Sequence, residues 1–147
     1  MKLEDFMNKI MSEDESITLT ICGSMRNKEL MEKYCAYYTI RNNVVLMPIN
    51  YLSIKKEVET FEDADNYFRK YREESHNKKI LLSDAIIVVV GEDNYFGTDT
   101  AREIGFAYGC KKPILFTSKM NQDDNVLYFN YDKYFPLCVL KENEKWL

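Results

Sequence analysis

The feature that most constrains this sequence is a strand, loop and helix pattern in residues 84–105. An apolar, mostly β-branched run, Ala85 to Val90, follows Asp84. A run of this kind, bounded by turn-forming residues, predicts a strand that is buried on both faces, as in a parallel sheet. A polar and aromatic loop then leads to a helix. We expect that helix to start at Thr98 or Asp99, because either residue is a good N-cap.

Glu103 lies about one turn into this predicted helix, next to the end of the strand. In open α/β sheets, ligands bind in the crevice beyond the carboxyl ends of the strands. The stretch therefore predicts a carboxylate and a helix N-terminus where a small polar ligand would bind. The alternative is a surface carboxylate paired with a Lys or Arg side chain. The buried strand and the apolar neighbours Ala101 and Ile104 favour a functional carboxylate.

The same pattern of strand, turn and helix opens the chain. A strand is predicted over 17–22 and a helix over 28–42, and the turn Gly-Ser-Met-Arg (23–26) joins them. The backbone N–H groups of such a turn form an anion site with the helix N-terminus, and Arg26 can add guanidinium donors. An ordinary β–α turn with a surface arginine remains the alternative.

Strands and helices alternate along the rest of the chain. The predicted elements are a short amphipathic helix over 1–13, strands over 44–48, 113–117 and 126–130, a charged helix over 61–83, and an aromatic tail over 131–147. Residues 49–60 fit a flap over the crevice. This alternation predicts one α/β domain over 1–147, a three-layer Rossmann-like or flavodoxin-like sandwich with a parallel sheet of about five strands.

Composition limits the partners and the compartment. The net charge is -4 and no basic tract occurs, which argues against nucleic acid and membrane surfaces as partners. No apolar run approaches the roughly 20 residues of a membrane span, and residues 1–13 do not resemble a signal peptide. The four cysteines are scattered without a CxxC pair, so we expect free thiols, no metal site and a cytoplasmic protein. Cys22 would lie nearest the crevice.

Three segments together carry a resemblance to a known family. They are ICGSMR at the first strand, SDAIIVVV with TAREIGFA around the third strand, and KKPILF after it. The chain resembles the nucleoside 2-deoxyribosyltransferase family and its relatives, the 2'-deoxynucleoside 5'-monophosphate N-glycosidases. The resemblance covers about Ile17 to Phe116 and includes the only histidine, His76, on the helix before the third strand.

The resemblance implies cleavage or transfer at the N-glycosidic bond of a (deoxy)nucleoside or its 5'-monophosphate. Glu103 matches the family nucleophile, which attacks C1' of the sugar and forms a glycosyl-enzyme. His76 stands near the position of an acidic residue in the active enzymes, and it can donate a proton to the leaving base if its pKa is normal or raised. The substrate-binding residues implied by the resemblance are Gly23, Ser24, Met25, Arg26, Gly97, Thr98, Asp99 and Thr100. It also implies no cofactor and a homodimer or larger assembly.

Two differences from the sequence pattern of the transferases leave other functions open. Transferases usually carry Asp six residues and Gly four residues before the nucleophile, whereas this chain has Gly97 and Asp99 at these positions. A non-catalytic nucleotide-binding or nucleotide-sensing module of the same fold is therefore the main alternative. The related phosphoribohydrolases carry a longer PGGxGTxxE motif, which GTDTARE matches poorly. Asp84 is predicted to have a structural role at the entrance to the third strand.

Overall fold

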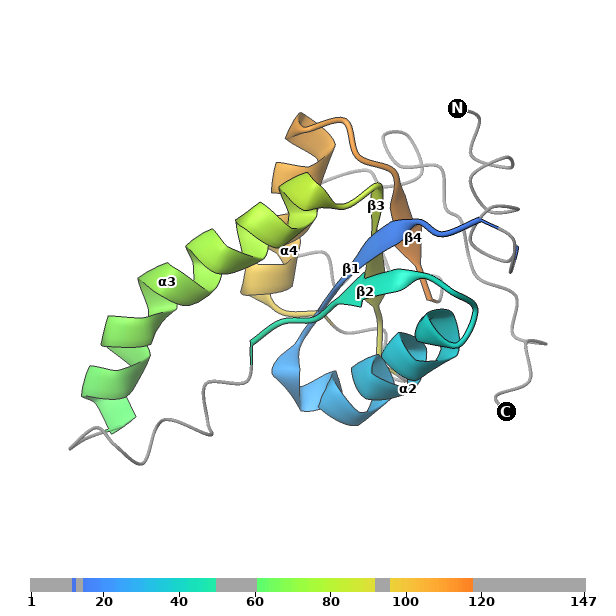
Figure 1. The fold of residues 1–147 in the computed structure, drawn as a ribbon. Helices are drawn as coiled ribbons and strands as arrows, with labels where there is room; N and C mark the ends of the chain where they lie inside the picture. Colours follow the sequence, from blue (N-terminus) through green and yellow to red (C-terminus); the bar gives the residue numbers. More distant parts are fainter. Residues whose placement is uncertain (1–11, 13–14, 50–60, 92–95, 118–147) are drawn as a thin grey trace.

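A four-stranded parallel sheet, in the order β2-β1-β3-β4, forms the centre of the protein (Figure 1). This computed structural model describes residues 12, 15–49, 61–91 and 96–117. The strands are β1 (Thr18–Gly23), β2 (Val44–Leu46), β3 (Ala85–Val89) and β4 (Ile114–Phe116). The helices are the 3-10 helix η1 (Met25–Asn27), α2 (Lys28–Thr39), α3 (Phe61–Leu82) and α4 (Thr98–Gly109).

Side chains of the strands alternate between two apolar layers, as the period of two of a strand requires. On one face, Leu19 and Ile21 of β1 pack in a cluster with Met31 of α2. On the other face, Cys22 belongs to a cluster with Ile80 of α3 and Ile104 of α4. Helix α2 thus covers one face of the sheet, and α3 and α4 cover the other (Figure 1). The predicted three-layer α/β sandwich is confirmed.

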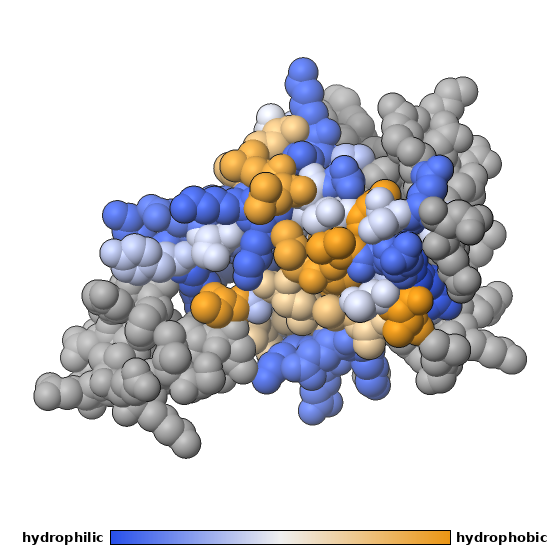
Figure 2. All heavy atoms as spheres, in the orientation of Figure 1, coloured by the Kyte–Doolittle hydropathy of each residue, from blue (hydrophilic) through white to orange (hydrophobic). Residues whose placement is uncertain are grey.

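Helix α3 extends well beyond the sheet. Hydrophilic side chains follow it along one face of the molecule, and apolar side chains gather near its C-terminal end (Figure 2), where Leu81 and Leu82 are exposed. The predicted range of this helix, 61–83, agrees with the observed one to within a residue. None of the helices in the described ranges is both long and apolar enough to cross a membrane.

Several predicted details are wrong at the ends and edges of elements. Val44 is 51% exposed, so β2 is not a buried strand; among the described strands it pairs with β1 alone. Helix α4 starts at Thr98, as predicted, but its N-cap is Gly97, with no side-chain cap bond, rather than Thr98 or Asp99. That helix ends in Cys110 as C-cap, and Lys111 rather than Gly109 adopts the left-handed conformation, with φ 58°.

Other predictions lie outside the described residues. These are the N-terminal helix, the flap over 50–60, the fifth strand over 126–130 and the aromatic tail over 131–147. They stay predictions.

Asp84 has the structural role that the sequence predicts. Its carboxylate accepts a hydrogen bond of 2.8 Å from the Thr18 N–H, and its own N–H donates to the Thr18 carbonyl at 2.8 Å. We expect Asp84→Ala to lower the free energy of unfolding by about 1 kcal/mol, because one partner of a hydrogen bond is lost. Urea unfolding measures this loss. Asp84→Asn keeps an acceptor oxygen and should cost less; an equal loss in both variants would contradict the role of this bond.

Candidate functional site

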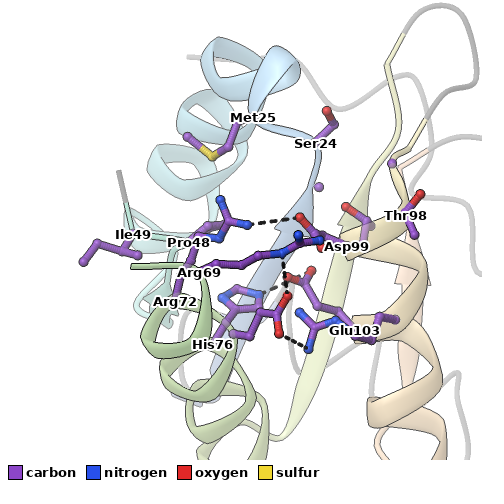
Figure 3. Close-up of a pocket in the computed structure, with 15 residues that line it drawn as sticks. Ser24, Met25, Pro48, Ile49, Arg69, Arg72, His76, Thr98, Asp99 and Glu103 are labelled. Carbon is purple, nitrogen blue, oxygen red and sulfur yellow. Dashed lines mark hydrogen bonds and ion pairs between the residues drawn. The ribbon is translucent and has the colours of Figure 1, made fainter. Parts of the chain in front are cut away.

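Strand β1 lies between β2 and β3 in the sheet, so the chain first runs from β1 to β2 on one side of β1 and then crosses to β3 on the other side. This reversal makes a topological switch point between β1 and β3. Ligands of open α/β sheets bind at such a point, beyond the carboxyl ends of the strands. A cavity of about 430 Å³ lies there. This volume is within the range of small-molecule sites. Its walls come from Gly23 at the end of β1, from α3, and from the N-terminal half of α4 (Figure 3).

Nearly all of the predicted site residues lie in the wall of this cavity. Those in its wall are Gly23, Ser24, Met25, His76, Gly97, Thr98, Asp99, Thr100 and Glu103. Arg26 is the exception, because the η1 turn leaves its side chain exposed and it is not part of the cavity wall. The structure thus brings together the turn after β1 and the first two turns of α4, as the sequence predicts, without the predicted arginine.

Apart from His76, the residues that α3 contributes to the cavity wall were not predicted from the sequence. Arg69, Arg72 and Glu73 line the cavity together with His76. Their spacing of three, four and seven residues places them on one face of a helix. That spacing, counted back from His76, was the signal that could have found them. Arg102 of α4 and the residues Pro48 and Ile49 after β2 complete the wall.

Ion pairs connect α3 to α4 across the cavity. Arg72 pairs with Asp99 at 3.3 Å, and Glu73 pairs with Arg102 at 3.7 Å. Within α3, Glu73 also lies 3.5 Å from Arg69. All of these side chains are partly exposed, so each pair adds at most about 1 kcal/mol to stability. Their larger effect is on the field inside the cavity, where three guanidinium groups face the carboxylates of Glu73 and Asp99.

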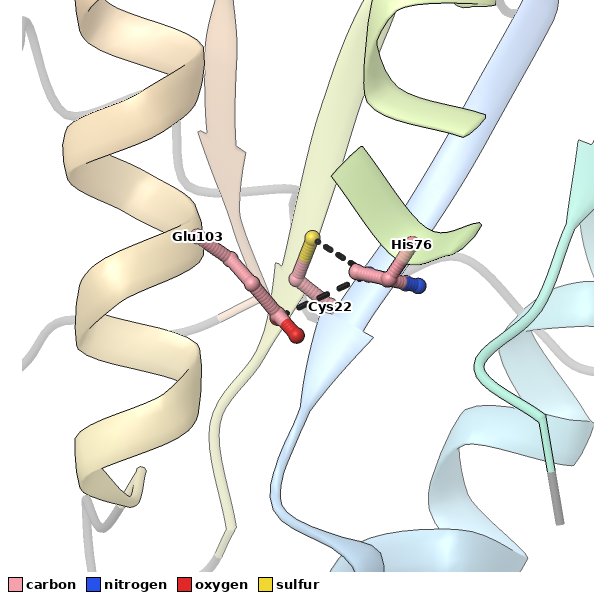
Figure 4. Close-up of side chains that lie close together, drawn as sticks. All are labelled: Cys22, His76 and Glu103. Atoms are coloured by element: carbon pink, nitrogen blue, oxygen red, sulfur yellow. Dashed lines mark hydrogen bonds and ion pairs between the residues drawn. The ribbon is translucent and has the colours of Figure 1, made fainter. Parts of the chain in front are cut away.

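Three buried side chains meet beneath the cavity (Figure 4). Cys22 comes from β1, His76 from α3 and Glu103 from α4, and they are 0%, 3% and 9% exposed. The His76 Nε2 atom lies 3.4 Å from Cys22 Sγ and 3.6 Å from Glu103 Oε2. Cys22 is next to the crevice, as predicted, and its partners come from helices that follow it by more than 50 residues.

Burial determines the protonation states of Glu103 and His76. It raises the pKa of Glu103 to about 8, against the opposing effects of the Cys22 thiol and the nearby guanidinium groups. Burial, with the charges of Lys79 and Arg102, lowers the pKa of His76 to about 4. Near neutral pH, the pair therefore holds one proton, on Glu103, and His76 is neutral. The condition that His76 has a normal or raised pKa is not met, so it is not an imidazolium donor in the free protein.

These pKa shifts predict how stability depends on pH. The unfolded state releases the Glu103 proton near pH 4.5 and the folded state near 8, so stability falls as pH rises between these values. His76 has the opposite effect between about 4 and 6.5, because the unfolded state binds its proton more tightly. The effect of Glu103 is therefore unopposed by His76 between about pH 6.5 and 8.

In this window we expect the wild type to lose about 2 kcal/mol of stability relative to Glu103→Gln, which has no proton to release. Urea unfolding of both proteins at pH 6.5 and 8 measures the difference. A difference that is constant or that grows in favour of the wild type would contradict the raised pKa.

Comparisons with known proteins show the fold. No protein-family model matches the sequence, and no curated protein matches it. The structure is similar to that of a 2-deoxyribosyltransferase from the psychrotolerant bacterium Bacillus psychrosaccharolyticus. The two share 17% sequence identity with a TM-score of 0.50, over 84% of this chain and 99% of that chain. At this identity the similarity shows that the two chains share a fold.

Proposed function

We propose that this protein cleaves or transfers at the N-glycosidic bond of a (deoxy)nucleoside or its 5'-monophosphate. One observation carries the proposal: the carboxyl group of Glu103 lies in the wall of a cavity of ligand size, at the switch point of the sheet and 3.6 Å from the His76 imidazole. The shared fold with a 2-deoxyribosyltransferase supports it. The match of Glu103 to the nucleophile of the nucleoside 2-deoxyribosyltransferase family also supports it.

The reaction would use the single proton of the Glu103–His76 pair. Glu103 gives its proton to His76, and its carboxylate oxygen bonds to C1' of the sugar as the bond from C1' to the base breaks. The departing base takes the proton from the imidazole, so the charges balance. Water or the N–H nitrogen of a second base then attacks C1', its proton returns to the Glu103–His76 pair, and the bond from C1' to Glu103 breaks. The carboxylate suits this step because its negative charge stabilises the oxocarbenium-like transition state.

The charges around the cavity fit a substrate with an anionic group. Arg69, Arg72 and Arg102 line its wall, and the turn after β1 adds Ser24. Arginine forks suit phosphate oxygens. A 5'-phosphate would then contact α3 and the β1 turn, and Arg26 would not be needed.

The test is an assay for free base with a panel of deoxynucleosides and their 5'-monophosphates. The proposal predicts base release and, in a rapidly quenched sample, a covalent adduct of the sugar with the peptide that contains Glu103. Tight nucleotide binding without base release would instead support the binding-module alternative. One observation favours that alternative: Glu103 is uncharged near neutral pH in the free protein, because its pKa is about 8.

The shared proton predicts a bell-shaped pH profile. We expect kcat/KM to be highest between about pH 4 and 8, because the pair gains a second proton below this range and loses its only proton above it. In His76→Asn the carboxylate cannot pass its proton to an imidazole. The remaining rate of that variant should therefore rise with pH toward 8. A wild-type profile that rises through pH 8 would contradict the shared proton.

A further inference from the structure

The group beneath the cavity has the composition of a metal site. Cys22, His76 and Glu103 each offer one ligand atom, and these three atoms lie within 4.8 Å of one another. They come from β1, α3 and α4, so no short sequence motif contains all three. Scattered cysteines without a CxxC pair predict no metal, but that rule applies to ligands that are close in sequence.

The distances suit one tetrahedral ion. With Zn–S of about 2.3 Å and Zn–N or Zn–O of about 2.0 Å, neighbouring ligands of a tetrahedral zinc lie roughly 3.5 Å apart. The observed separations are 3.4 Å from Cys22 Sγ to His76 Nε2 and 3.6 Å from His76 Nε2 to Glu103 Oε2. The third pair, Cys22 Sγ and a Glu103 carboxylate oxygen, lies within 4.8 Å. An ion bound between the three atoms would bring this pair to a separation of roughly 3.5 Å.

The burial of the ligand atoms also supports a metal site. Glu103 Oε2 is buried and has no hydrogen-bond partner among the described residues. Buried polar atoms nearly always have a partner, so this oxygen is available to a water molecule or an ion. A thiolate, a carboxylate and a neutral imidazole carry two negative charges, which one divalent cation neutralises. Such a site avoids the cost of a buried net charge.

We propose that Cys22, His76 and Glu103 bind a single thiophilic divalent cation of the zinc class. Sulfur and imidazole ligands favour Zn²⁺ and Co²⁺ over Mg²⁺ and Ca²⁺, which prefer oxygen. His76 and Glu103 line the cavity, so the ion enters from there and takes a water molecule as its fourth ligand.

Binding of this ion does not depend on the proposed function, but it has a consequence for it. A metal-bound Glu103 cannot attack the sugar. The cation would therefore act as an inhibitor of base release, and a chelator would restore activity.

Cobalt titration of chelator-treated protein tests the site. We expect one equivalent of Co²⁺ to produce a thiolate-to-cobalt charge-transfer band, and one equivalent of Zn²⁺ to remove it. Cys22→Ser should lose the band, and His76→Asn should weaken cobalt affinity at least about 100-fold, more than the loss of an outer-shell partner. The matched control is Cys35→Ser, a half-buried thiol on α2 that is not part of the cluster, and this variant should keep the band.

The outcomes separate the site from the proposed function. A wild-type protein without the band at one equivalent of Co²⁺ overturns the metal site, whether or not the variants fold. A band that survives Cys22→Ser also overturns it. If base release persists in protein saturated with zinc, Glu103 is not a ligand and the assignment fails. If the band appears but metal-free protein releases no base, the metal site stands and the proposed function fails.

Discussion

Replacing Glu103 with glutamine is expected to lower kcat/KM for base release by at least about 10³-fold, because an amide cannot form the glycosyl-enzyme. The side chain keeps its size, so the buried position next to His76 and Cys22 stays filled. Measurement of free base from the best substrate of the panel, under single-turnover and steady-state conditions, gives the effect. The covalent adduct should disappear at the same time.

Glu73→Gln is the matched control for this substitution. Glu73 lines the same cavity, but it is partly exposed and lies between Arg69 and Arg102 rather than beside His76. We expect its loss to lower kcat/KM less than about tenfold, since a partly exposed ion pair contributes about 1 kcal/mol or less. If Glu103→Gln kept more than a tenth of the wild-type rate, or if Glu73→Gln were the more damaging change, Glu103 would not be the nucleophile.

Truncation of Ile87 to alanine is expected to lower the free energy of unfolding by about 3 kcal/mol. Ile87 is in the middle of β3, fully buried, with Ile21 of β1 and Leu115 of β4 as its neighbours in register. It packs in the cluster that α2 covers. The loss combines the transfer free energy of the removed methyl groups with the cost of the cavity that remains.

Two other variants check this prediction. Ile87→Val removes a single methylene and should cost about 1 kcal/mol. Leu82→Ala, at a side chain that is 75% exposed at the end of α3, should change stability by less than about 0.5 kcal/mol. Urea unfolding gives all three values. A loss below about 1 kcal/mol for Ile87→Ala would contradict the central place of β3 in the core.

The type and order of the main helices and strands could be predicted because local periodicity in the sequence indicates them. The β-branched run of β3 and the charged helix α3 each have one favoured interpretation, and both appear within a residue or two of the predicted limits. Element ends were predicted less well. They depend on single caps such as Gly97 and on left-handed residues such as Lys111, where competing local signals differ by little free energy.

The sequence by itself determined the α/β sandwich and the two segments, after β1 and after β3, that form the crevice, because parallel strands bring their carboxyl ends to one edge of the sheet. Only the tertiary structure decided that Arg26 stays outside that crevice and that Cys22 meets His76 and Glu103. Those contacts join residues more than 20 positions apart in the chain. They arise from the packing of α3 and α4 on the sheet, and no local pattern records that packing. Burial in that interface also sets the protonation of the Glu103–His76 pair, which a sequence cannot show because desolvation depends on every neighbour in space.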